Sequence, residues 1–457
     1  MKSKYIGDRT FYMMVMAVAL PIMLQNFITN LVNMLDNMMV GALGTEQMSG
    51  VSIVNQLVFV YNLCIFGGLS GIGIFTSQYY GKNDNEGIRY TLRMKLITAV
   101  VVSISAIALF SFCDDFYINL FLHEVDERAD LALTLSFAKE YLRVIIIGLL
   151  PFAFSQMLAS TLRETGNTLT PMMAALAAVI TNGVFNYFLI FGKAGFPAMG
   201  VKGAAIATVM SKFVELFTVA VYIVVKRKQY VYINGAFRSL KIPGKLFLSV
   251  LAKGSPLLVN EFLWSAGMTT LSIAYSLHGI SVVAACSIAF SVTNLFNIAF
   301  ISLGTSIGII TGKSLGAGRH EEAMDNARKM MALSVSVSTV IGIILYFIAG
   351  GITVFYKTSE ESKELALYFI RVCSFAMPLH AIANASYFTL RSGGKTLVTF
   401  AFDSGVMWIV SVPLAFLLYA GGLNIKVVFP IIQFSEIIKV IIGLTLIKKR
   451  VWVRTIV

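Results

Sequence analysis

Charged residues are scarce in this chain of 457 amino acids. They make up 13% of the sequence, against about 25% in an ordinary soluble domain, while hydrophobic residues make up 57%. This balance excludes a typical soluble protein. It predicts a polytopic membrane protein whose helices cross the lipid bilayer.

Cysteine is also rare, and its four copies follow no C-x-x-C spacing. A disulfide framework or a zinc site is therefore not expected. The sequence has no metal-ligand spacing, no phosphate-binding loop and no nucleophile beside a base, so we expect neither an enzyme nor a bound organic cofactor. Because it also has no ATP-binding motif, any transport should draw on an ion gradient.

The net charge of +13 could suggest a nucleic-acid partner. Most lysines and arginines, however, fall in alternate loops, on one side of the expected membrane, whereas the acidic loop 113–130 falls on the other. By the positive-inside rule, both termini and the long loop 226–250 should be cytoplasmic. This topology explains the basic charge, so no nucleic-acid partner is expected.

Apolar segments long enough to span a bilayer recur about every 35 residues. Twelve transmembrane helices are therefore predicted, at 11–38, 51–79, 94–113, 132–160, 168–191, 202–225, 250–277, 284–312, 329–355, 364–389, 396–420 and 424–447. An all-α membrane protein follows, and we expect it in the cell (plasma) membrane.

The first of these segments carries a polar face. It has no charge before Asp36, yet four carboxamides recur at steps of four, three and four, namely Asn26, Asn30, Asn33 and Asn37. That spacing places them on one side of a helix. Because a carboxamide or an acid facing lipid is costly, this side should face protein or a watery cavity, and Asp36 is a functional candidate. Pro21 permits a bend in the same helix, as a hinge.

The chain contains an internal repeat. Shifted by 235 positions, residues 21–93 superpose on 256–328 without a gap. The matched pairs include Pro21 with Pro256, Gly81 with Gly316, and Arg93 with Arg328. Farther on, STLRETGNTL at 160–169 matches FTLRSGGKTL at 388–397. Six spans separate the copies, so the two halves should cross the membrane in the same direction, as two pseudo-symmetric six-helix bundles. The expected parts are an N-terminal lobe at 1–225, a cytoplasmic linker at 226–250 and a C-terminal lobe at 251–457.

These motifs resemble one known family. The LP-x-M-x-Q segment at 20–25 followed by Asp36, the paired G-I-x-T…G segments and the paired TLR…G-x-TL loops are similar to those of the multidrug and toxic compound extrusion (MATE) family. The resemblance covers nearly the whole chain. It implies a secondary exporter that couples inward movement of Na⁺ or H⁺ to efflux of amphiphilic, often cationic, organic compounds by rocker-switch antiport, functional as a monomer.

Asp36 is the first candidate for ion coupling. An acid near a helix end can simply be solvated or cap a turn, whereas a carboxylate among amide oxygens can bind Na⁺ or a proton. Asn182 and Asn186 share a helix face at i, i+4 and could instead bond between helices. By resemblance, these two and Thr208 complete the cation site, with Asn186 standing where some members carry a second acid.

The second half offers a different set of polar residues. Glu261 is the repeat partner of Asn26, and with Trp264 nearby it suits an organic cation, although a neighbouring lysine or the backbone could equally satisfy the acid. His380 lies about where one branch of the family has a coupling Asp, so it is either a proton-sensitive group or a core histidine. Asp403 is a deep acid without an obvious partner. We expect Glu261, Trp264, His380 and Asp403 to line the substrate cavity with Asn26, Asn30 and Asn33.

Two further pairs of charged residues lie three residues apart on predicted spans. Lys212 with Glu215, and Glu436 with Lys439, should pair within their own helices, with no transport role. Two other functions are compatible with the sequence: a flippase for lipid-linked precursors or other amphiphiles, from the same superfamily, and a non-transporting membrane scaffold or receptor. Few buried basic residues and twelve spans speak against the first, and the buried acids against the second.

Overall fold

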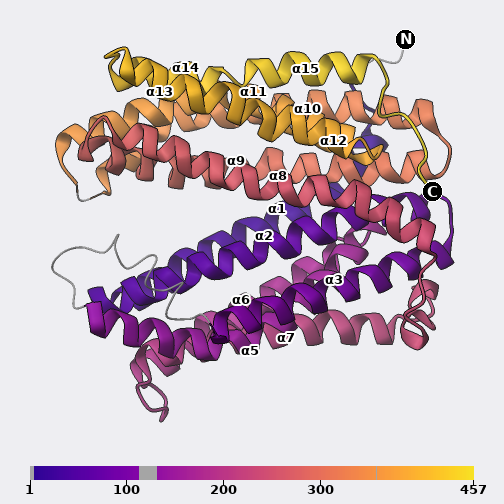
Figure 1. Ribbon diagram of the computed structural model, residues 1–457, viewed down its shortest axis with the longest axis horizontal. Helices are drawn as coiled ribbons and strands as arrows, with labels where there is room; N and C mark the ends of the chain where they lie inside the picture. Colours follow the sequence, from indigo (N-terminus) through magenta and orange to yellow (C-terminus); the bar gives the residue numbers. More distant parts are fainter. Residues whose placement is uncertain (1–4, 113–130, 357) are drawn as a thin grey trace. The chain divides into compact units, whose positions relative to one another are not determined.

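A computed structural model describes residues 5–112, 131–356 and 358–457 (Figure 1). Within these ranges twelve helices are long and apolar enough to cross a membrane, which confirms the all-α prediction of twelve spans. Apart from short helical turns in the loops, the described chain is built from these spans. The acidic loop 113–130, with Cys113, lies outside the described residues.

The helices follow the predicted segments closely. The first six spans are α1 (Arg9–Gly41), α2 (Thr45–Gly81), α3 (Asn85–Phe112), α5 (Leu131–Glu164), α6 (Leu169–Phe191) and α7 (Gly200–Val225). The next four are α8 (Gly244–Ser276), α9 (Ile280–Gly316), α10 (His320–Val354) and α11 (Glu360–Ser392). The eleventh joins α12 (Thr396–Phe400), the π-helical turns η3 (Ala401–Gly405) and η4 (Met407–Ser411), and α13 (Val412–Ala420). The twelfth joins α14 (Ile425–Phe434) and α15 (Ile437–Lys448).

The chain divides into two compact units. The N-terminal unit comprises Leu24–Thr76 and Asn85–Leu248, and the C-terminal unit comprises Met1–Met23, Ser77–Asp84 and Ser249–Val457. The division therefore passes through α1, two residues after Pro21. The lobe limits expected from the repeat, 1–225 and 251–457, stay a prediction.

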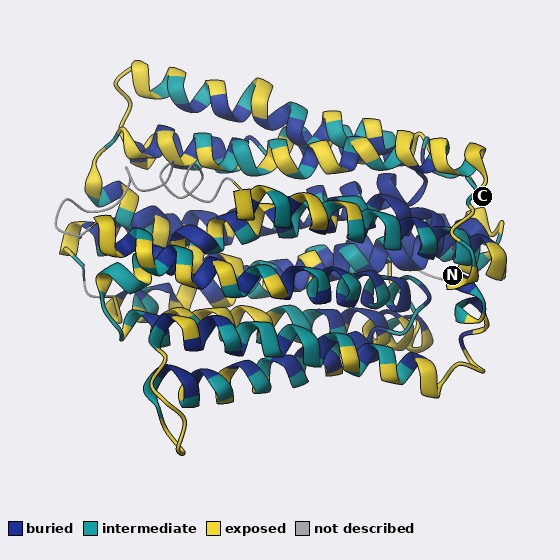
Figure 2. Cartoon of the chain, turned by 60° about the horizontal axis from the view of Figure 1, so that its bottom comes forward, coloured by how far each residue is buried: buried dark blue, intermediate teal, exposed yellow. Residues whose placement is uncertain are grey.

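Each unit has its own apolar core. In the N-terminal unit, buried side chains of α2, α3 and α5 pack together, and the Tyr61 hydroxyl lies 2.9 Å from that of Ser103 and donates to the Leu149 carbonyl at 2.7 Å. In the C-terminal unit, Phe11 and Val15 from the start of α1 pack among residues of α9, α10 and α11. Exposed residues lie along the spans (Figure 2), and many of them are large and apolar, as a lipid environment requires.

Two glycines matched by the repeat allow a close helix crossing in the C-terminal unit. A Cβ at Gly81 would lie 2.0 Å from the carbonyl oxygen of Lys313, and a Cβ at Gly316 would lie 1.9 Å from that of Gln78. Gln78 and Lys313 are themselves separated by the repeat interval of 235 residues. The end of α2 and the end of α9 therefore touch through equivalent residues, and only glycine leaves room for the opposing backbone.

The linker between the two halves is folded against the N-terminal unit. Its two 3₁₀ turns are η1 (Val231–Ile233) and η2 (Ala236–Arg238), and Tyr232 and Ala236 are buried. Arg93 of α3 donates to the carbonyls of Ala236 at 2.7 Å and of Lys241 at 2.8 Å. Hydrogen bonds from α3 therefore hold the linker, which is expected to be cytoplasmic, against the N-terminal unit.

Candidate functional site

The expected cation-site residues meet in the N-terminal unit. Asn186 Nδ2 of α6 donates to Asp36 Oδ1 of α1 and, at 3.2 Å, to Asn182 Oδ1. Asn182 Nδ2 in turn donates to Thr208 Oγ1 of α7 at 3.3 Å. The i, i+4 spacing on α6 places the two carboxamides in line, so one chain of hydrogen bonds links α1, α6 and α7.

This cluster has the donor atoms that a hard monovalent cation needs. Asn186 is 1% exposed, and its Oδ1 is buried with no hydrogen-bond partner in the described part of the chain. A buried amide oxygen without a partner is costly and favours a ligand that accepts its lone pairs. With the Asp36 carboxylate and the Asn182 and Thr208 oxygens nearby, the residues fit Na⁺ as well as a proton on Asp36.

Two further residues reach the Asp36 cluster, and neither was expected from the sequence. The Tyr141 side chain of α5 is 2% exposed and is hydrogen-bonded to Thr208. It also interacts electrostatically with Asp36. Lys212 of α7 also acts on Asp36, with its ammonium 5.0 Å from the centroid of the Phe152 ring. No pattern pointed to Tyr141, because its position in an apolar span shows nothing of what packs against it.

The pairing expected for Lys212 is wrong. Its i+3 neighbour Glu215 accepts a hydrogen bond from Gln156 Nε2 of α5 at 3.1 Å instead. The reason is tertiary: α5 packs along α7 and offers Glu215 a neutral amide, while the Lys212 side chain extends to an aromatic ring.

The polar stripe of α1 runs from the middle of the helix to Asp36. Asn26 is half-buried, and Asn30 and Asn33 are exposed. Asn30 Nδ2 donates to the Asn26 carbonyl at 2.9 Å, so part of the stripe bonds along its own helix. Pro21 lies within α1, which continues unbroken from Arg9 to Gly41. The roles of the stripe in substrate binding and of Pro21 as a hinge stay predictions.

In the C-terminal unit, Glu261 lies in a charged environment. It is half-buried on α8 and interacts with Arg391 and Tyr387 of α11, and with Asp403 of η3. A basic residue does neighbour this acid, but it is an arginine rather than the lysine considered from the sequence. Trp264 is 37% exposed one turn farther along α8.

Asp403 has partners, contrary to the expectation from the sequence. Lys439 Nζ of α15 lies 3.0 Å from Asp403 Oδ1, and Asn260 Nδ2 of α8 donates to Asp403 Oδ2 at 3.1 Å. Lys439 Nζ also lies 2.9 Å from Glu436 Oε1, which confirms the expected pair within the last span. The sequence suggested Lys439 as a partner for Glu436 alone, because only that pair is local.

His380 is half-buried on α11, and its Nε2 lies 3.2 Å from Gln433 Oε1 of α14. A histidine with such a partner fits the core interpretation. Its role in substrate binding stays a prediction.

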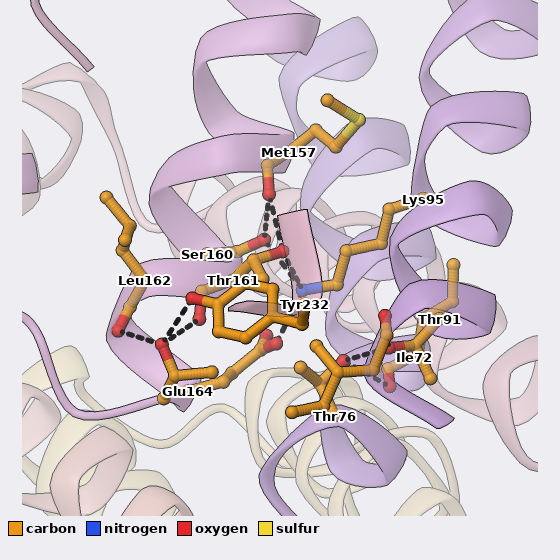
Figure 3. A network of polar contacts seen from close by, with 12 residues as sticks. Ile72, Thr76, Thr91, Lys95, Met157, Ser160, Thr161, Leu162, Glu164 and Tyr232 are labelled. Atoms are coloured by element: carbon orange, nitrogen blue, oxygen red, sulfur yellow. Dashed lines mark hydrogen bonds and ion pairs between the residues drawn. The ribbon is translucent and has the colours of Figure 1, made fainter. Parts of the chain in front are cut away.

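A second polar network lies in the N-terminal unit (Figure 3). The fully buried Lys95 of α3 donates to Glu164 Oε2 at 2.5 Å, to Ser160 Oγ at 3.0 Å and to Thr161 Oγ1 at 3.1 Å, all on α5. Next to this network, Thr165 shares a hydrogen bond of 3.0 Å with Tyr232 of the linker. The sequence gives no signal for this network, because Lys95 and Glu164 lie on different spans.

Known proteins match this chain over most of its length. A model of the MatE family matches residues 21–188 and, a second time, 256–417, which confirms the repeat. A probable multidrug resistance protein NorM from Thermotoga maritima is 26% identical over 401 residues, covering 88% of this chain and 84% of the relative. A probable multidrug resistance protein YoeA from Bacillus subtilis is 24% identical over 408 residues, covering 87% and 85%.

The fold is also that of solved transporters. A crystal structure of MATE in complex with MaL6 superposes with a TM-score of 0.85 at 20% identity, over 98% of this chain and 97% of that chain. The two family matches together span more than half of the sequence and fall on the spans that carry Asp36, Asn186, Glu261 and Asp403. The chain belongs to the MatE family of multidrug and toxic compound extrusion transporters.

Proposed function

We propose that this protein is a secondary exporter in which one monovalent cation, Na⁺ or H⁺, moves inward at Asp36 while an amphiphilic, often cationic, organic compound moves outward. The observation that carries the proposal is the cluster of Asp36, Asn186, Asn182 and Thr208. In this cluster one acid lies among neutral side chains whose oxygens can act as cation ligands, and all of them are on membrane spans. Intramembrane acids of this kind are costly to maintain and are typical of ion pathways.

The charge of the cluster supports a stoichiometry of one cation. Asp36 is its acid, and Asn186 contributes a neutral amide that orients the carboxylate. A single negative charge is neutralised by one Na⁺ or one proton. Lys212 interacts electrostatically with Asp36, and the amide contact from Asn186 reaches one of the carboxylate oxygens, Oδ1.

Pro21 is the proposed hinge of the transport cycle. Proline supplies no backbone N–H to the helix, so α1 can bend there at lower cost than elsewhere. The division of α1 between the two compact units falls just after this residue. Neutralising Asp36, fifteen positions beyond Pro21, would change which neighbours the outer part of α1 can contact and thereby release substrate.

Each half offers candidate substrate contacts: the α1 stripe in the N-terminal unit, and Glu261 and Trp264 of α8 in the C-terminal unit. A carboxylate beside an exposed indole ring attracts organic cations through charge and through cation–π contact. Multidrug resistance is what the names of the relatives state, and it supports this substrate class. We place the protein in the plasma membrane, with both termini cytoplasmic, and working as a monomer.

The test is gradient-driven transport of a fluorescent organic cation in proteoliposomes. We expect the wild-type protein to accumulate the dye against its gradient when a Na⁺ or a H⁺ gradient is imposed separately, and Glu261→Gln to weaken accumulation of cationic dyes more than that of neutral ones. No gradient-dependent flux of any dye, together with movement of a fluorescent lipid analogue between leaflets, would contradict the proposal in favour of a flippase.

A further inference from the structure

The C-terminal unit contains a buried ammonium group held by two acids. Lys439 is 4% exposed, and its Nζ lies 3.0 Å from Asp403 Oδ1 and 2.9 Å from Glu436 Oε1. The side chains of these acids are 21% and 14% exposed. A charge buried to this degree is retained only where partners compensate its desolvation.

Neutral groups hold the Asp403 carboxylate in place. Asn260 donates to the second oxygen of Asp403 at 3.1 Å, and Ser404 Oγ donates to Asn260 Oδ1 at 2.7 Å, which fixes the carboxamide. Asp403 itself lies in the π-helical turn η3, a type of helix distortion that is frequent at functional sites. The carboxylates of Asp403 in η3 and Glu436 at the start of α15 therefore both contact the Lys439 ammonium, and Asn260 of α8 orients the Asp403 carboxylate.

The last span of each half carries a lysine and an acid three residues apart, in opposite order. Lys212 and Glu215 of α7 align with Glu436 and Lys439 at a constant shift of 224 residues, which also aligns Ser211 with Ser435. In the first half, the candidate acid Asp36 is bonded to the neutral Asn186, and Lys212 lies over a ring. In the second half, the lysine bonds the candidate acid directly.

We propose that the Lys439 ammonium is a resident cation of the C-terminal unit. It occupies the position that a mobile monovalent cation would otherwise take between Asp403 and Glu436, and so prevents ion binding at this pair of acids. Removing the ammonium should convert the pair into a binding site for an alkali cation or a small alkylammonium ion. This inference concerns binding alone and does not depend on coupling at Asp36.

The physical reason lies in the charge left behind. Without Lys439, the Asp403 and Glu436 carboxylates, which both contact its ammonium, lose their compensating charge, and the repulsion between them destabilises the folded state. A cation that binds between them in the folded state, and not in the unfolded chain, reduces this repulsion and raises the melting temperature once its concentration exceeds its Kd. Methylammonium is the sharpest probe, because it reproduces the lysine head group without its stem.

The test uses the purified full-length protein, with Asp36→Asn present throughout so that the first half contributes no cation effect. Melting temperatures are measured in methylammonium, sodium and choline chloride at equal ionic strength. For Lys439→Met we expect Tm to rise with the concentration of methylammonium or Na⁺ relative to choline. With Lys439 present, we expect no such rise.

A charge-matched variant covers the case in which Lys439→Met does not fold. Lys439→Met with Glu436→Gln keeps the original net charge and leaves Asp403 as the ligand, so its Tm should also rise with the concentration of the cation. Adding Asp403→Asn removes both acids and should abolish it. The proposal is overturned if neither of the first two variants responds to either cation, or if the protein that retains Lys439 responds equally.

Discussion

Asn186 on α6 donates its side-chain hydrogen bond to Asp36 on α1, across 150 residues of sequence. The contact ties the acid of the first span to a neutral amide, and it leaves the amide oxygen of Asn186 buried without a partner among the described residues. An acid held by one donor, next to an unused acceptor, can take up a cation and release it again.

Replacing Asn186 by leucine should weaken cation binding at this site. The substitution keeps a similar volume but removes both the hydrogen bond to Asp36 and a candidate ligand oxygen. Because a polar contact to a charged group contributes about 1.5–3 kcal/mol, loss of the ligand oxygen should raise the half-saturating Na⁺ concentration for dye efflux about tenfold or more. The measurement is efflux at a series of imposed Na⁺ gradients.

Thr181→Val serves as the matched control for that series. Thr181 lies on the same helix and is half-buried, and among the described residues its hydroxyl bonds the Ala177 carbonyl of its own turn, at 2.8 Å. It should leave the half-saturating concentration unchanged. Equal curves for Asn186→Leu and the wild-type protein would show that Asn186 takes no part in cation binding.

The buried pair of Lys95 and Glu164 should contribute strongly to stability. The Lys95 side chain is 0% exposed, so Lys95→Met leaves Glu164 without its compensating charge. Breaking such a pair costs about 3–5 kcal/mol, whereas replacing both partners is close to neutral. We therefore expect Lys95→Met to lower the melting temperature strongly. Lys95→Met with Glu164→Gln should restore most of the wild-type melting temperature. A double variant no more stable than the single one would refute this interpretation.

The crossing of α2 and α9 should not tolerate a side chain at either glycine. Gly81→Ala and Gly316→Ala place a Cβ about 2 Å from backbone oxygens that cannot move independently of their helices. We expect both variants to lower the melting temperature and to reduce the yield of folded protein, to similar extents because the two sites are equivalent. Gly350→Ala on α10, where a Cβ meets nothing within 4 Å, should be neutral or stabilising.

Arg93 should hold the linker in its folded form. Its guanidinium bonds the carbonyls of Ala236 and Lys241, so Arg93→Ala should let this segment open more often and be cut faster by trypsin after the exposed Arg238 and Lys241. We expect faster cleavage in inside-out vesicles and none in right-side-out vesicles, which also tests the cytoplasmic placement. Arg319→Ala is the control. It removes an exposed arginine that bonds Glu322, and this variant should be cleaved at the wild-type rate.

Much of the fold follows from the sequence because a membrane permits few alternatives. Backbone groups in hydrocarbon must bond within their own segment, so apolar runs of sufficient length become helices, and the repeat then orders them into two halves. The i, i+4 spacing likewise predicts that Asn182 and Asn186 share one helix face, and the hydrogen bond between their side chains confirms it.

The partners of the buried charges could not be predicted in the same way. Asp403 lacked an obvious partner because Lys439 lies 36 residues away on the next span, and local spacing assigned that lysine to Glu436 alone. Tyr141 reaches the Asp36 cluster only because α5 packs beside α7. Helical periodicity gives the face of one helix, whereas these contacts depend on how several helices pack.

The role of Asp36 is tested most directly by separating ion coupling from substrate exchange. Asp36→Asn keeps the size of the side chain and its contact with Asn186 but removes the charge. In proteoliposomes loaded with dye, this variant should still exchange internal for external dye when no ion gradient is present, while net accumulation driven by a Na⁺ or H⁺ gradient should be lost. Accumulation equal to that of the wild-type protein under the same gradient would contradict coupling at Asp36.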